Sequence, residues 1–311
     1  EPCVKLAQML CEKTGMKKVF FGNSGAEANE CAIKAARKWS EEKKGKDYST
    51  IITLKNSFHG RTITTLAATG QDVFHHDFTP LTEGFVYAEP NDLADLEQLI
   101  KANKCAAVMM EVVQGEGGVM PLDEAYVKGA AKLCEQYDLL LICDEVQVGN
   151  GRSGKLYGYM HYGVQPDIVS TAKGLAGGLP LGATLLGEKV QDVLSAGTHG
   201  STFGGNPVCC AGALSILHRL DGPLLQSVQE KSDFIVKALT GAKGVRSVTG
   251  LGLMLGVETE RPVKDVISEC MARGVLVISA KNKVRLLPAL NIPMAQLEQA
   301  VSVLKDVCAG E

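Results

Sequence analysis

Long apolar runs are missing from this sequence. The apolar segments AAVMM at 106–110 and LLLIC at 139–143 have five residues each, whereas a helix needs about 20 apolar residues to cross a bilayer. An excess of one charge is missing as well, because 32 Lys and Arg stand against 35 Asp and Glu, a formal net charge of −3. No basic patch of the kind that binds nucleic acid stands out. We therefore expect neither a membrane nor a nucleic acid as a partner.

Cysteine is abundant, with ten residues, but the patterns that would give it a special role are missing. No C-x-x-C pair occurs, and no cluster of Cys and His has the spacing of a zinc site. Several cysteines lie inside apolar runs, where a free thiol behaves as a small hydrophobic side chain. We expect reduced thiols, a cytoplasmic location and no bound metal.

A regular alternation of short apolar strands and amphipathic helices is present from about residue 17 to residue 190. IITL at 51–54 and LLLIC at 139–143 are typical of the strands, and the segment 123–137 is typical of the helices. Such an alternation indicates an α/β fold in which a mostly parallel sheet lies between two layers of helices.

The DGP tripeptide at 221–223 interrupts this alternation. The sequence beyond it is typical of a smaller α+β region, with three helices and the strands VRSV, LMLGV, VLVIS and VRLLP. The length of 311 residues is usual for a globular protein of two domains. We predict a large domain over residues 1–220 and a small C-terminal domain over residues 221–311.

The segment GNGRSG at 149–154 matches the G-x-G-x-x-G pattern of dinucleotide-binding proteins. That motif works only where its glycines join a strand directly to a helix whose N-terminus holds a pyrophosphate. Here DEVQV separates the strand from the first glycine, and the segment KLYGYMHYG that follows is not typical of a helix. We interpret GNGRSG as a glycine-rich loop, and a nucleotide-binding oxidoreductase stays only as an alternative function.

One lysine stands alone in the segment DIVSTAKGLAGGLPLGATLLG at 167–187. Lys173 is followed by small and apolar residues, and no acidic residue comes after it until Glu188. An isolated ammonium group is costly to bury unless it is paired or loses its proton. A lysine at this position therefore requires an explanation.

The segments that follow the predicted strands are the candidates for a site, because ligands of open parallel sheets bind beyond the carboxyl ends of the strands. These segments are GNSGAEANE, KNSFHGR, EVVQGEGG, DEVQ and TAK. Each has an ordinary alternative when it is taken singly. Ser24 and Glu27 can simply cap a helix. Phe58 can belong to the core, Arg61 can be a solvated charge, and Asp144 can be part of a capped turn.

Taken together, these segments supply what pyridoxal phosphate (PLP) requires. Its aldehyde condenses with a lysine amine that loses its proton readily, which the apolar, glycine-rich surroundings of Lys173 favour. Its ring nitrogen needs a carboxylate, a role for which Asp144 is suited. Its phosphate needs backbone N–H groups at the start of a helix, and its ring needs flat or branched apolar side chains.

Six segments, taken in order, resemble the class III aminotransferases of PLP fold type I: FGNSGAEANECAIKAAR, SFHGRT, EVVQGEGG, CDEVQVGNGRSG, STAKGLAGGLPLGA and GSTFGGNP. The resemblance covers essentially the whole chain and implies transamination between a small-molecule amino donor and 2-oxoglutarate. FHGR and VRLLPALNI are similar to the branch of the family that transfers the δ-amino group of N-acetylornithine in arginine biosynthesis. Transfer from ornithine, succinylornithine or 4-aminobutyrate remains the alternative.

The resemblance also implies the roles of single residues. Lys173 would carry PLP and move protons, and Asp144 would pair with the ring nitrogen. Arg61 would hold the α-carboxylate of the donor, and Glu116 would cover Arg285 until 2-oxoglutarate is bound. The residues implied in cofactor binding are Ser24, Gly25, Ala26, Phe58, His59, Glu111, Asp144, Val146, Gln147, Lys173 and Thr202. Those implied in substrate binding are Arg61, Glu116, Ser201 and Arg285.

Two further expectations come from the same resemblance. Thr202 would reach the phosphate of a neighbouring subunit, which implies a homodimer with shared active sites. Members of the family have a further segment before EPCVKLA, so we expect this sequence to begin inside a longer protein. An inactive remnant of an aminotransferase is then one alternative. A PLP-dependent mutase or decarboxylase is another, although the paired Glu116 and Arg285 argue for two alternating substrates.

Overall fold

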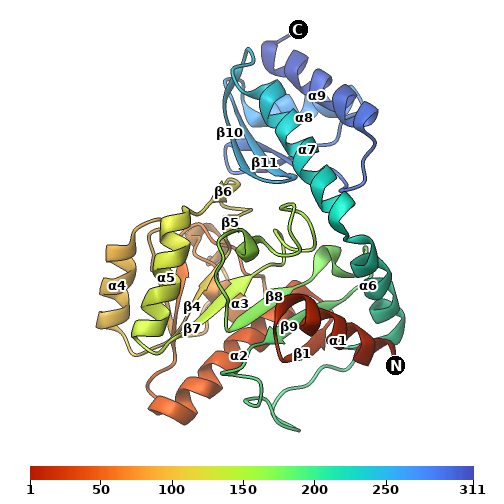
Figure 1. Cartoon of the computed structure of the whole chain (residues 1–311). Coiled ribbons are helices and arrows are strands. Elements are labelled where there is room, and N and C mark those ends of the chain that lie inside the picture. The colour runs from red at the N-terminus through yellow and green to blue at the C-terminus, as the bar shows by residue number, and fades with distance from the viewer.

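The computed structural model describes all 311 residues and contains two larger sheets, each with its own helices, and a two-stranded hairpin (Figure 1). The larger sheet has seven strands in the order β1-β9-β8-β7-β4-β2-β3. All of its strands point the same way except β9, which pairs antiparallel with both β1 and β8. In chain order these strands are β1 (Lys18–Gly22), β2 (Thr50–Leu54), β3 (Phe85–Ala88), β4 (Cys105–Met110), β7 (Leu140–Asp144), β8 (Ile168–Thr171) and β9 (Gly182–Leu186).

Helices cover both faces of this sheet, as the alternating pattern predicts. The helices of this part are α1 (Pro2–Thr14), α2 (Gly25–Lys44), α3 (Ile63–Ala68), α4 (Leu93–Ala102), α5 (Glu124–Gln136) and α6 (Pro207–Arg219), with short 3-10 turns η1 (Asp72–Phe74), η2 (Gly158–His161) and η3 (Lys173–Ala176). On one face, α2 packs Ile33 and Trp39 against the sheet. On the other, α1, α4, α5 and α6 bury a larger core that includes Leu6, Leu96 and Tyr126. The predicted α/β fold with a mostly parallel sheet is confirmed.

The DGP tripeptide lies at the bend between α6 and α7 (Gly222–Leu239). The side chain of Asp221 accepts a hydrogen bond from the backbone N–H of Leu224 and so caps α7. No single helix has the length and apolar composition of a membrane span. Helices α6 and α7 have them only when the two are taken together, and their axes are bent by 72°. The tripeptide therefore marks a change of direction of the chain.

Helix α7 leads into the second sheet, which is antiparallel and has the order β10-β11-β13-β12 (Figure 1). Its elements are β10 (Val245–Leu251), β11 (Met254–Thr259), α8 (Val263–Ala272), β12 (Ile278–Ala280), β13 (Lys283–Leu286) and α9 (Met294–Ala309). A core of its own, which includes Val257, Val266 and Leu304, lies between this sheet and its helices. We propose that this unit is the small domain and that it begins near residue 221.

A short hairpin, β5 (Val113–Gln114) and β6 (Met120–Pro121), lies between the two sheets (Figure 1). Its turn is held to the small sheet, because the hydroxyl of Thr249 donates to the carbonyl oxygen of Val119 at 2.9 Å. This hairpin brings Glu116 to the boundary between the two parts of the molecule.

Candidate active site

The segments that follow β2, β7 and β8 meet the start of α2 at the carboxyl edge of the large sheet. They enclose a cavity of about 210 Å³. Its lining consists of Gly25, Ala26, Asn29, Phe58, His59, Gly60, Arg61, Asp144, Val146, Gln147 and Lys173. A second cavity of about 880 Å³ shares Val146, Gln147 and Lys173 with the first and extends to Glu116 and Arg285. Lys173 thus stands where the two cavities adjoin.

Lys173 is separated from β8 by Ala172 alone and begins the short turn η3. Its backbone has φ +47°, in the left-handed region that side chains other than glycine rarely adopt. The side chain of Asn150 holds the approach to this turn, because its Nδ2 donates to Thr171 Oγ1 at 2.9 Å and to the carbonyl of Ala172 at 3.0 Å. The Lys173 side chain is accessible within the cavities, yet the protein around it displaces much of its water, and this desolvation lowers the pKa of Lys173. A lower pKa favours the neutral amine that can act as a nucleophile.

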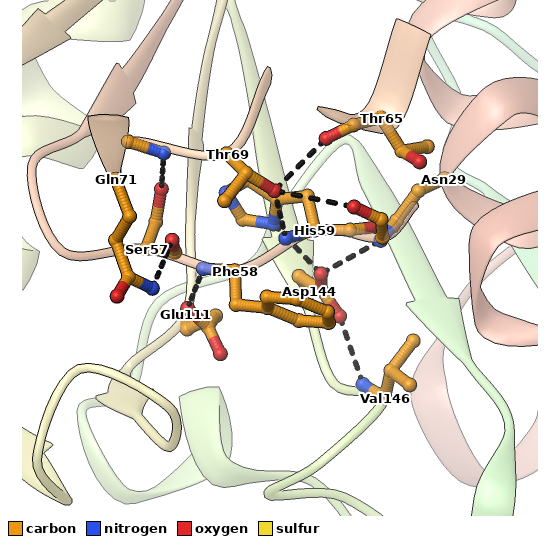
Figure 2. A network of polar contacts seen from close by, with 12 residues as sticks. Asn29, Ser57, Phe58, His59, Thr65, Thr69, Gln71, Glu111, Asp144 and Val146 are labelled. Carbon is orange, nitrogen blue, oxygen red and sulfur yellow. Dashed lines mark hydrogen bonds and ion pairs between the residues drawn. The ribbon is translucent and has the colours of Figure 1, made fainter. Parts of the chain in front are cut away.

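Asp144 ends β7 and is only 3% exposed. Its Oδ1 accepts the backbone N–H of Val146 at 3.0 Å. Its Oδ2 accepts two further hydrogen bonds, from Asn29 Nδ2 and from His59 Nδ1, both at 2.8 Å (Figure 2). The three contacts fix the plane of a carboxylate that faces the smaller cavity.

His59 is fully enclosed behind Asp144. Its backbone N–H donates to Thr69 Oγ1 at 2.9 Å, which holds the loop after β2 in place (Figure 2). Burial by itself lowers the pKa of His59, but the hydrogen bond and the negative charge of Asp144 raise it more, so that the pKa lies above its ordinary value. His59 Nδ1 carries the proton in the contact with Asp144, since a carboxylate oxygen can only accept.

Glu111 follows β4 and holds the loop after β2 through its contact with Phe58. Its Oε2 accepts the backbone N–H of Phe58 at 2.9 Å (Figure 2). Burial raises the pKa of Glu111 to about 7, because the charged form has lost its water. Glu111 therefore positions Phe58, which lines the cavity.

The start of α2 supplies backbone N–H groups to the smaller cavity through Gly25 and Ala26. Ser24 caps the helix, and its Oγ accepts the backbone N–H of Glu27 at 3.2 Å. A Cβ atom at Gly25 would lie 2.6 Å from Cγ1 of Val146, so only glycine lets this side chain approach. Free N–H groups and the positive end of a helix are suited to a phosphate.

Glu116 and Arg285 form an ion pair in the larger cavity. Nη1 of Arg285 lies 2.9 Å from Oε1 of Glu116 and 3.3 Å from Oε1 of Gln147. Arg285 comes from β13 of the small sheet, whereas Gln147 belongs to the loop after β7. The two contacts of Arg285 therefore connect the small sheet to the loop after β7 and to the β5–β6 hairpin.

Three predicted residues lie away from the centre of the site. Arg61 is exposed at the rim of the smaller cavity, with its guanidinium carbon 6.0 Å from the ring centre of Phe58. Ser201 lines neither cavity, and its Oγ accepts from Asn23 Nδ2 at 3.2 Å. Thr202 is exposed and also lines neither cavity. The structure brings the remaining predicted residues to the two cavities or, for Ser24 and Glu111, directly behind them.

Two residues of the smaller cavity, Asn29 and Gly60, were not predicted from the sequence. Asn29 stands four residues after Gly25 in the helix, and this spacing places both on one face. Gly60, inside FHGR, has φ +140°, and a Cβ there would lie 2.4 Å from Thr65 Oγ1. The four-residue spacing from Gly25 is the signal in the sequence that could have identified Asn29.

The predicted glycine-rich segment at 149–154 is part of the loop after β7, and no helix begins at its glycines. Asn150 supports the turn at Lys173, and Arg152 donates to the carbonyl of Leu253 at 3.1 Å. The segment lacks the junction of strand and helix that a dinucleotide requires.

PLP fits the residues of the smaller cavity. An amine (Lys173), a carboxylate (Asp144) and the start of a helix (Gly25) line the same space as an aromatic ring. Nε2 of Gln147 is buried and has no hydrogen-bond partner in the protein, so a polar atom of a bound group can satisfy it.

The model of the family "Aminotransferase class-III" matches residues 1–308. The chain belongs to the class III aminotransferases. The acetylornithine aminotransferase of Haemophilus ducreyi is 52% identical over 309 residues, which are 99% of this chain and 79% of that protein. The succinylornithine transaminase of Citrobacter koseri is 45% identical over 318 residues, with 99% of this chain and 78% of that protein covered.

Solved structures of class III aminotransferases have the same fold. The ornithine aminotransferase of Toxoplasma gondii superposes with a TM-score of 0.95 at 33% identity, over 99% of this chain and 76% of that one. The N-acetylornithine aminotransferase of Stenotrophomonas maltophilia superposes with a TM-score of 0.86 at 33% identity, over 100% and 80%. This class III aminotransferase is therefore a PLP-dependent enzyme, as its motifs predict.

Proposed function

We propose that this aminotransferase transfers the δ-amino group of N-acetylornithine to 2-oxoglutarate, a reaction of arginine biosynthesis. The similarity to the acetylornithine aminotransferase of H. ducreyi supports this donor, because it extends over 99% of the chain at 52% identity. The residues of the two cavities supply the chemical reasons.

The structural argument for this donor is the absence of a free carboxylate in the lining of the smaller cavity. N-acetylornithine and ornithine differ at the α-nitrogen, which is a neutral acetamide in the first and an ammonium in the second. Asp144 is the one acidic residue of that lining, its oxygens accept three hydrogen bonds, and its remaining lone pair would be taken by the ring nitrogen of PLP. An ammonium there would lose water without gaining a partner, so the acylated donor is favoured.

Six residues would hold the cofactor. The N–H groups of Gly25 and Ala26 would bind its phosphate, Phe58 and Val146 would contact its ring, and Asp144 would face the ring nitrogen. Lys173 would bind it covalently. When bound, PLP supplies an electron sink for negative charge at the substrate carbon that bears the amino group.

Lys173 would also move the proton of the reaction. Its Nζ would remove a proton from that substrate carbon and return one, and a neutral amine is required for the first of these steps. The lowered pKa of Lys173, which arises from desolvation, supports this role.

Arg61 and Arg285 would bind the carboxylates of the two substrates. Arg61, at the rim of the smaller cavity, would form a bidentate contact with the α-carboxylate of N-acetylornithine. Glu116 neutralises Arg285 while this donor is bound, and the α-carboxylate of 2-oxoglutarate would replace Glu116 in the second half of the reaction.

A homodimer is the proposed working unit. Thr202 is exposed and lines neither cavity of its own chain, whereas the neighbouring Ser201 is held by Asn23. The Thr202 side chain is then free to complete the phosphate site of a second copy.

The decisive experiment compares kcat/KM for N-acetylornithine, succinylornithine, ornithine and 4-aminobutyrate, each with 2-oxoglutarate, on the PLP-loaded protein. We expect the highest value for N-acetylornithine. A higher value for succinylornithine would move the proposal to that donor. Equal or better use of 4-aminobutyrate, which has no α-nitrogen, would overturn the argument from the missing carboxylate.

A further inference from the structure

The buried amide of Asn29 contacts Asp144 from the helix that also supplies the start of the phosphate site. Asn29 is 1% exposed, and its Nδ2 donates to Asp144 Oδ2 at 2.8 Å and to the carbonyl oxygen of His59 at 2.7 Å (Figure 2). Both partners can only accept, so the NH₂ side of the amide must face them. The orientation of the Asn29 side chain is therefore fixed by its neighbours.

The other side of the same amide has no partner. Oδ1 of Asn29 is buried and accepts no hydrogen bond in the protein. An unpaired buried acceptor destabilises a fold, and an apolar side chain of similar size would avoid it. The presence of asparagine at this position therefore indicates that the Nδ2 donor of Asn29 is required by its partners.

The lone pairs of Asp144 show what this need is. Each carboxylate oxygen has two lone pairs. Asn29 Nδ2 and His59 Nδ1 use both pairs of Oδ2, whereas the backbone N–H of Val146 uses only one pair of Oδ1. One lone pair of Oδ1 thus remains for a ligand in the cavity.

We infer that Asn29 is a positioning residue that, together with His59, saturates Oδ2 of Asp144 and so presents Oδ1 to the protonated ring nitrogen of PLP. This inference rests on the proposed role of Asp144. Asn29 itself acts through the carboxylate, which it holds in one rotamer. Without its donor, Oδ2 would have a free lone pair, and the carboxylate could rotate.

A pair of cofactors separates this role from a merely structural one. PLP and deaza-PLP, in which a carbon atom replaces the ring nitrogen, have the same shape and phosphate, but only PLP can donate to Asp144. Kd values for both are measured by titration of the cofactor-free protein and its Asn29→Leu variant. The preference for PLP is the ratio of the Kd for deaza-PLP to the Kd for PLP. We expect this ratio to be roughly tenfold lower in the variant, which corresponds to the loss of one hydrogen bond to a charged group. If the substitution merely damages the pocket, the Kd values for PLP and deaza-PLP will rise by the same factor. That result would overturn the inference.

The controls keep the two proposals distinguishable. Ser40→Ala changes the same helix at a buried hydroxyl that has no hydrogen-bond partner, and it should leave the preference for PLP unchanged. A wild-type protein without any preference for PLP would refute the proposed role of Asp144. A wild-type preference that Asn29→Leu retains would refute the role of Asn29 alone. If Asn29→Leu does not fold, Asn29→Ala, which only shortens the side chain, provides the same comparison.

Discussion

The guanidinium of Arg285 lies 2.9 Å from the carboxylate of Glu116, although 169 residues separate them in the chain. Arg285 belongs to β13 of the small sheet and Glu116 to the β5–β6 hairpin, whose turn is held to the same sheet by Thr249. The ion pair is thus a second connection between the hairpin and the small sheet. A substrate carboxylate that replaced Glu116 at Arg285 would break this connection and leave the one between Thr249 and Val119 in place.

The first prediction concerns this pair. Glu116→Gln keeps the size of the side chain but removes the charge that neutralises Arg285, so an α-carboxylate should bind Arg285 more easily. We expect kcat/KM for glutamate, relative to that for N-acetylornithine, to rise by about tenfold. Steady-state kinetics with both donors measure this ratio. Glu89→Gln, which changes a surface ion pair with Lys55, is the control, and an unchanged ratio in Glu116→Gln would exclude the proposed switch.

The second prediction concerns the covalent attachment of PLP. Reduction with borohydride should fix the cofactor on Lys173, because its amine lies at the junction of the two cavities and has a lowered pKa. Mass spectrometry of the reduced and digested protein locates the modified lysine. Lys173→Ala should lose the modification and Lys155→Ala should keep it. Modification of any other lysine in the wild-type protein would disprove the assignment.

The third prediction concerns the approach of α2 to Val146. Gly25→Ala places a Cβ atom 2.6 Å from Cγ1 of Val146, so either the helix start or the wall of the cavity must move. We expect PLP to bind at least tenfold more weakly, since positions of binding groups must hold to within about 0.5 Å. Equilibrium dialysis measures the Kd. Gly222→Ala, at a helix start with open space around it, should leave the Kd unchanged.

The fourth prediction concerns the stability of the cofactor-free protein. The pKa of Glu111 rises from its ordinary 4.5 to about 7 because the carboxylate is buried. The folded state then keeps a proton that the unfolded chain releases. Its contribution to stability is complete below pH 4.5 and is lost as the pH rises to about 7, a loss of about 3 kcal/mol.

Glu111→Gln tests this dependence, because the amide oxygen can still accept the N–H of Phe58 and no charge appears at high pH. Urea unfolding at pH 5 and pH 8 gives the free energy of unfolding of both proteins. The variant should gain stability relative to the wild type at pH 8 and not at pH 5. Equal differences at the two values would show that Glu111 does not titrate in this range.

The positions of the site residues were largely predictable, because the carboxyl ends of parallel strands meet at one edge whatever the details of packing. Asp144 is the last residue of β7 and Lys173 comes two residues after the end of β8, so their segments were identified from the strands alone. The reversed direction of β9 was not predicted, since a run of apolar residues has the same composition in either direction. The contact of Glu116 with Arg285 could be expected only from the resemblance to a family, because no local pattern connects residues so far apart.

Asn29 shows why part of the site stayed hidden. An asparagine in the fifth position of a helix is unremarkable by composition, and its meaning depends on which carboxylate faces it. That partner comes from β7, more than a hundred residues later. The spacing from Gly25 places Asn29 on the same face of the helix, but no local pattern identifies Asp144 as its partner.

The left-handed backbone of Lys173 has a consequence for protein engineering. A side chain at φ +47° costs about 1 kcal/mol that glycine would not. Lys173→Gly removes this strain but raises the entropy of the unfolded chain by a similar free energy, so the cofactor-free protein should melt at nearly the same temperature and have no transaminase activity. A campaign that selects variants by heat resistance alone would not eliminate this substitution. Position 173 must consequently be held constant when the enzyme is adapted to industrial temperatures.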